Sequence, residues 1–205
     1  LKLTEAFLQN VNLAGANLDK ADLWGADLTG ASLADARLRK ASLAGARLRQ
    51  TNLERATLTE ADLRGADFTE ADLERAFLEG ADLRAANLTA ADLQFASLPH
   101  TNLQHARLLG ANLRGAHFER ADLRQAVFES ANLHGASLDG ADLRGADFTR
   151  ADLSRADLTG ARFPDGEALL TLFDDVRSLE GAKLDDAVEA ALRAAHPWLF
   201  HAVPA

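Results

Sequence analysis

Apolar residues recur at every fifth position of this chain from Leu3 to Phe163 without a break. All 33 of these positions hold Leu or Phe. The residue two places earlier is Ala except in four quintets, which have Leu1, Val11, Thr51 and Thr101. On an α-helix, five residues rotate about 140° beyond a full turn, so these side chains would wind around the cylinder and form no apolar face. A heptad coiled coil fails for the same reason. A flat strand would turn every second Leu to solvent, because its side chains alternate with period two.

The pattern is satisfied if each quintet is a short extended piece followed by a turn. The Ala and the Leu or Phe are two residues apart, so both point inward while the residue between them points outward. Twelve of the 14 glycines lie in the repeats, all at the fifth position, where a tight turn favours a positive φ. The outward position is mostly Asp, Asn or Ser, whose short polar side chains bond to nearby backbone. We therefore predict an all-β solenoid with Leu, Phe and Ala inside.

The quintets resemble the motif A-(D/N)-L-x-x of the pentapeptide-repeat family, over residues 1–163. The resemblance implies a right-handed quadrilateral β-helix with four quintets to a coil, one on each face. Thirty-three quintets then make about eight coils, and stacking at the strand spacing of about 4.8 Å gives a rod roughly 40 Å long. Thr51 and Thr101 each place a hydroxyl in the interior, where we expect either local widening of the coil or a bond to a neighbouring carbonyl.

The five-residue period ends at Phe163, and residues 164–205 form a different segment. Asp165 is a candidate N-cap for a helix whose apolar residues recur from Leu169 to Leu179. A second helix is expected from about Leu184 to Ala195, before Pro197. We expect this short helical cap to cover the last coil. The alternative is a homodimer contact, which some members of the family make through their C-terminal ends. The candidate residues for either role are Phe173, Val176, Trp198, Leu199 and Phe200.

Composition and charge exclude several classes of protein. The absence of cysteine excludes disulfides and thiolate metal sites. A net charge of −9 argues against general binding to nucleic acids or anionic membranes. No apolar run is long enough to span a membrane, and no signal-like segment opens the given sequence. We therefore expect a cytoplasmic protein. Because the chain begins with Leu1 and has no methionine, we expect its natural start to lie upstream.

Folding the quintets by fours gives two candidate interaction sites. The first is a charged face made of Asp22, Asp62, Asp82, Asp122 and Asp142 with Arg64, Arg84, Arg124 and Arg144. We interpret it as a self-neutralised, solvated face, and the alternative is a docking face. The second is an aromatic patch, expected near one corner, made of Arg75, Phe77, Phe95, Pro99, His100 and His117. Exposed aromatic residues beside Arg are typical of protein interfaces. The alternative is that they are scattered surface residues.

The sequence favours a binding function over catalysis. The inward positions leave no pocket for a catalytic group, and the six histidines show no metal-ligand spacing, so we expect no enzyme activity, metal or cofactor. The leading hypothesis is a rigid scaffold that binds a protein partner. The alternative rests on the family resemblance, since members linked to quinolone resistance mimic B-DNA and bind DNA gyrase, a type II topoisomerase. This chain departs from them because Arg is interleaved with its acidic residues and no loop projects from the coil.

Overall fold

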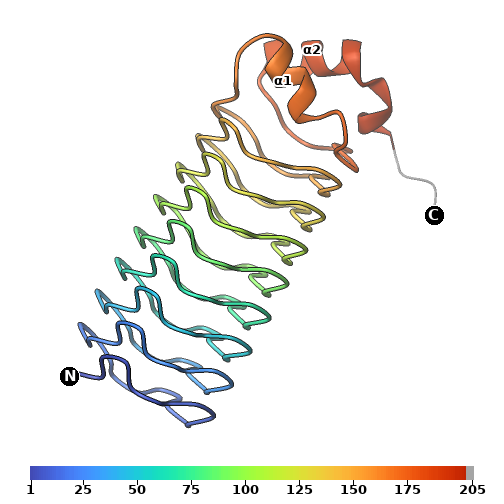
Figure 1. The fold of residues 1–205 in the computed structure, drawn as a ribbon. Coiled ribbons are helices and arrows are strands. Elements are labelled where there is room, and N and C mark those ends of the chain that lie inside the picture. The colour runs from blue at the N-terminus through green and yellow to red at the C-terminus, as the bar shows by residue number, and fades with distance from the viewer. Residues whose placement is uncertain (202–205) are drawn as a thin grey trace.

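The computed structural model describes residues 1–201, which form a rod of stacked coils with helices at its C-terminal end (Figure 1). Isolated parallel β-bridges join outward residues that are 20 apart, from Lys2↔Asp22 to Asp142↔Arg162. Twenty residues are four quintets, so the coil has four faces. We number the faces 1 to 4 by their first outward residues, which are Lys2, Phe7, Asn12 and Asn17.

The hydrogen bonds of one quintet explain why its outward residue is so often Asp or Asn. In the quintet 81–85, Asp82 N–H donates to the coil before, and the amides of Leu83 and Ala85 donate to the coil after. Ala86 N–H closes the turn onto the Leu83 carbonyl. The amide of Arg84 is left over, and the Asp82 carboxylate accepts its hydrogen bond at 3.2 Å. This side-chain contact recurs along the rod and satisfies a donor that the ladder leaves free.

Each corner is a tight turn with a left-handed residue. Positive φ occurs at every fifth position from Glu5 to Gly160, of which 12 are Gly and 20 are not. A non-glycine residue in this region costs roughly 1–2 kcal/mol. The ladder therefore imposes the turn on residues that would not adopt it alone, and the glycines only relieve part of its cost.

The interior is filled by the inward residues, all of which are buried from Leu18 to Leu158. Phe128 stacks on Phe148 with centroids 5.0 Å apart, and it meets Phe118 edge to face at 6.4 Å. The two buried threonines are satisfied as predicted, because Thr51 Oγ1 donates to the Leu28 carbonyl at 2.8 Å and Thr101 Oγ1 donates to the Leu98 carbonyl at 2.7 Å.

The C-terminal segment differs from its prediction in the first helix. Helix α1 spans only Glu167–Leu172, and Gly166 rather than Asp165 is its N-cap residue, with no side-chain cap. Val176 and Leu179, expected on this helix, belong instead to a further piece of the coil. Ser178 pairs with Asp152 on face 3, and Lys183 pairs with Asp157 on face 4. These bridges span 26 residues instead of 20, because the excursion that contains α1 inserts six extra residues.

Helix α2 (Asp186–Ala195) agrees with the predicted second helix to within about two residues, and the 3-10 helix η1 (Pro197–Phe200) follows it. These helices lie beside α1 at the end of the rod (Figure 1). Leu192 and Leu199 are buried there, and the Leu199 carbonyl accepts a hydrogen bond from Leu179 N–H at 2.7 Å. The helices thus cover the last turn of the coil.

Candidate interaction surfaces

The aromatic patch is centred on face 4. Phe77 and His117 stand two coils apart in its outward column, with Ser97 between them. Arg75 and Phe95 precede this face at one corner, and Pro99 and His100 follow it at the other. The expectation that the patch gathers near one corner is therefore wrong, because the four-quintet coil places its residues on a whole face and on both of its edges.

Contacts within the patch hold its aromatic side chains in place. Phe95 is 44% exposed, and its ring lies over the backbone of Gly115 in the next coil. A Cβ at Gly115 would lie 2.7 Å from that ring, so glycine is required there for the ring to pack. The Arg75 guanidinium lies 5.9 Å from the ring centroid, within the range of a cation–π contact.

Phe77 is 50% exposed and borders a shallow groove of about 250 Å³ on face 4. The groove is also lined by Arg39, Thr59 and Glu79, which come from three successive coils. His117 extends the surface, and its Nδ1 lies 3.0 Å from the Glu119 carboxylate. Face 4 therefore combines two exposed rings with polar groups of both charges.

The charged face coincides with face 1, where each Arg forms a two-pronged ion pair with the Asp of its own quintet. Arg64 donates to Asp62 through Nε and Nη2, both at 2.7 Å. The same geometry recurs in the other pairs, Asp82–Arg84, Asp122–Arg124 and Asp142–Arg144. Arg64 also lies 3.9 Å from the carboxylate of Asp82 in the next coil. Asp22, which Trp24 follows, has no Arg of its own.

These ion pairs change the acidity of the carboxylates. The hydrogen bonds from Arg64, Arg124 and Arg144 lower the pKa of Asp62, Asp122 and Asp142, respectively, below the ordinary value of 3.8. Burial opposes this effect but is the smaller influence. The carboxylates therefore stay ionised and paired at neutral pH.

Acid should remove the stabilisation that these pairs provide. Because the folded pKa values lie below the unfolded value of 3.8, the stabilisation is fully present above that pH and is lost as the pH falls through the folded values. We expect the Asp62→Asn, Asp122→Asn, Asp142→Asn protein to lose up to about 1 kcal/mol per pair at pH 6. Urea unfolding at pH 6 and at about pH 2 measures the difference from wild type, which should shrink in acid. An equal difference at both pH values would contradict this account.

The five candidate cap residues divide into a buried set and an exposed set. Phe173, Val176 and Leu199 are buried, and Phe173 packs on Phe163 of the last regular coil with centroids 5.8 Å apart. Phe200 is half-buried, and the Arg193 guanidinium lies 4.1 Å from the centroid of its ring. Trp198 is 57% exposed. The dimer contact at this end stays a prediction, and Trp198 is the residue best placed to make it.

Two exposed aromatic residues were not among the candidates. Phe7 is 85% exposed on face 2 in the first coil, and Trp24 is 49% exposed at the following corner of face 1. Their signal in the sequence is a large apolar residue at a position that does not point into the coil. Among residues 1–201, no three His, Asp or Glu side chains gather that could hold a metal ion, and no helix is long and apolar enough to cross a membrane.

A four-sided coil with an apolar interior and columns of outward side chains on its faces defines the class of protein as a quadrilateral β-helix. The family described as pentapeptide repeats (8 copies) matches residues 2–35, 31–69, 66–104, 91–129 and 126–163. The chain therefore belongs to the pentapeptide-repeat family, and its β-helix is right-handed.

Solved structures of this family resemble the chain over most of its length. HetL, involved in heterocyst differentiation regulation in the cyanobacterium Nostoc sp. strain PCC 7120, is 40% identical, with 80% of this chain and 79% of HetL covered and a TM-score of 0.40. A trypsin-treated R167E form of QnrB1, a plasmid-mediated fluoroquinolone resistance protein, is 23% identical, with 97% and 95% covered and a TM-score of 0.53. No curated protein matches the chain.

Proposed function

We propose that this protein is a non-catalytic, rigid scaffold for protein–protein interaction and that the aromatic patch on face 4 contacts its partner. The observation that carries the proposal is the pair of half-exposed rings, Phe77 and Phe95, held in register by the coil. Aromatic residues and Arg supply much of the binding energy at protein interfaces. A preformed surface also binds without the entropy cost of ordering its side chains. The absence of catalysis is part of the proposal, and it is supported by an interior made of Leu, Phe and Ala.

A site-specific crosslink tests which face binds. A photoreactive amino acid at Ser97, between Phe77 and His117, should capture a defined partner from cells of the source organism. The same group at Ser42, which is also half-exposed but lies on face 1, should not. In the Phe77→Ser, Phe95→Ser protein, the yield of crosslinked partner should fall at least about tenfold, because each hot-spot residue contributes about 2 kcal/mol or more of binding free energy.

Trp24→Ser is the matched control, since it removes an aromatic residue of similar exposure on another face. The assignment of the patch would be overturned if the photoreactive group captured the partner equally well at Ser42 and at Ser97. It would also be overturned if the double substitution at face 4 left the crosslink from Ser97 unchanged. Circular dichroism of each variant separates lost binding from lost folding.

Mimicry of B-DNA toward a type II topoisomerase is the alternative, and the charge distribution does not favour it. Face 1 carries six acidic and six basic side chains within its quintets, and face 3 carries six and four. A DNA mimic needs a continuous negative surface, whereas here Arg side chains neutralise the main column of Asp residues. Crosslinking to gyrase, or inhibition of its supercoiling activity, would favour mimicry over the scaffold proposed here.

A further inference from the structure

The β-ladder of face 2 is one coil shorter than those of faces 3 and 4. It ends at Asp147, whereas faces 3 and 4 continue to Ser178 and Lys183. The chain leaves the coil after Arg162, forms α1, and returns at Asp175, whose carbonyl accepts a hydrogen bond from Arg150 N–H at 2.6 Å. The quintet that would stack on residues 146–150 is therefore missing, and α1 stands above its place.

The missing quintet leaves two backbone groups without partners. One coil earlier, the Ala126 carbonyl accepts from Asp147 N–H at 2.9 Å, and Phe128 N–H donates to the Asp147 carbonyl at 2.7 Å. Within residues 1–201, the corresponding carbonyl of Ala146 and N–H of Phe148 make no hydrogen bond. Together they form the two halves of a parallel β-bridge that one extended residue could complete.

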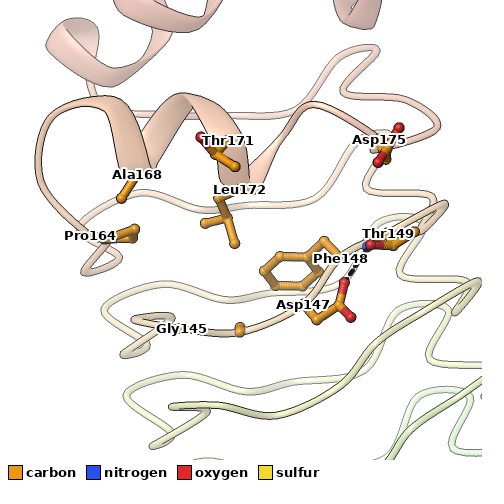
Figure 2. A pocket seen from close by; sticks show the side chains of 10 residues that line it. Gly145, Asp147, Phe148, Thr149, Pro164, Ala168, Thr171, Leu172 and Asp175 are labelled. Carbon is orange, nitrogen blue, oxygen red and sulfur yellow. Dashed lines mark hydrogen bonds between the residues drawn. The ribbon is translucent and has the colours of Figure 1, made fainter.

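A cavity of about 390 Å³ lies between this edge and α1 (Figure 2). Pro164, Ala168 and Leu172 provide an apolar wall on one side of it. The carboxylates of Asp147 and Asp175 lie on the other side, near Thr149 (Figure 2). The cavity therefore joins an open backbone edge, apolar contacts and negative charge in one place.

The opposite face shows how such an edge is filled. On face 4, the segment Ala182–Lys183–Leu184 stacks on residues 156–158. Lys183 N–H donates to the Ala156 carbonyl at 2.9 Å, and its carbonyl accepts from Leu158 N–H at 2.8 Å. The Lys183 ammonium meets the Asp157 carboxylate at 2.9 Å. Residues 146–148 are Ala-Asp-Phe where residues 156–158 are Ala-Asp-Leu, so the empty edge has the same chemistry as the filled one.

We propose that the cavity binds an extended segment of a partner protein with the sequence pattern small–basic–apolar, as a guest strand that completes the ninth coil of face 2. The backbone of the basic residue bridges Ala146 and Phe148, and its side chain pairs with Asp147. The apolar residue turns inward toward Leu172, and the small residue fits where the coil normally holds Ala. Main-chain bonds then supply affinity and the charged column supplies selectivity, as in other cases of β-strand addition.

Fluorescence anisotropy with the labelled peptide acetyl-Gly-Ala-Lys-Leu-Thr-amide tests the proposal on the full chain. Saturable binding is expected, and replacing Lys by Glu in the peptide should weaken it by about tenfold or more, because a repulsive pair replaces an attractive one. Methylating the backbone nitrogen of Lys removes the bond to Ala146 and should also weaken binding by about tenfold. The amide resonance of Phe148 should shift on binding, while that of Leu83 in the middle of the rod should not.

Filling the cavity provides the decisive control. Ala168→Trp, on the side of α1 that lines the cavity, should abolish binding, whereas Ala194→Trp, at an exposed position of α2 outside the cavity lining, should leave it unchanged. The proposal is overturned if the peptide shows no saturable binding at about millimolar concentration, if the N-methylated peptide binds equally well, or if both Trp variants behave alike. None of these measurements involves face 4, so their outcome is independent of the proposed scaffold function.

Discussion

Replacing Phe128 by Ala should lower the free energy of unfolding by about 3–5 kcal/mol. Phe128 is fully buried and contacts two other rings, stacking on Phe148 and meeting Phe118 edge to face. Removing it leaves a cavity that the backbone cannot close, because each coil is fixed to its neighbours by ladder bonds above and below. The loss therefore combines the transfer free energy of the ring with the energy of its lost contacts.

Equilibrium unfolding in urea measures this change, provided that the denaturant dependence of the variant matches that of wild type. Val127→Ala is the matched control, because Val127 is the adjacent residue but points outward and is only half-buried. Its substitution should cost well under about 1 kcal/mol. A loss at Phe128 as small as that at Val127 would contradict a close-packed interior.

Replacing Phe173 by Ala should release the C-terminal helices from the end of the rod. Phe173 is fully buried and packs on Phe163, which joins the helical segment to the last regular coil. Truncating a buried Phe costs about 3–5 kcal/mol. Because each coil contacts only its neighbours, the loss should be concentrated at this end of the rod.

Hydrogen exchange can locate the effect. The amides of Leu153, Arg155 and Leu158 bond to carbonyls of Ser178, Glu180 and Lys183, so their exchange should accelerate by about a hundredfold or more. The amide of Leu83, which bonds to Asn102 in the middle of the rod, should not change. Trp198→Ala is the control, because it removes a large ring that is mostly exposed. Acceleration along the whole rod would show that the rod unfolds as one cooperative unit.

The regular part of the fold follows from the sequence because its contacts are periodic. Every inward residue meets the residues 20 positions before and after it, so one rule of spacing places them all. The pairing of Asp62 with Arg64 could be predicted in the same way, since it lies within one quintet and repeats along a column. Burial of the Thr51 and Thr101 hydroxyls indicated either local widening or a carbonyl bond, and the structure shows the bond in both cases.

The predictions for the C-terminal segment fail where the period changes. Ala182–Lys183–Leu184 has the motif of the repeat, but a six-residue insertion separates it from the regular register, and six is not a multiple of five. Val176 and Leu179 also fit helical spacing, so a helix explains their positions in the sequence as well as a further piece of the coil does. Within the regular repeats, the aromatic patch spans a whole face and not one corner, because the residues before and after a quintet's extended piece lie at opposite edges of its face.

By itself, the sequence determined the short extended pieces, the turns between them and the apolar interior, since local turns and a constant spacing suffice to specify them. The resemblance to the family added the four faces of the coil. Only the tertiary structure decided that the chain skips one quintet of face 2 and rejoins the ladder on face 3. That choice depends on contacts between distant segments, such as the packing of Phe173 on Phe163 and the hydrogen bond from Leu179 N–H to the Leu199 carbonyl, which no repeat period encodes. The cavity above Phe148 exists for the same reason, because it is the space left where α1 replaces a strand.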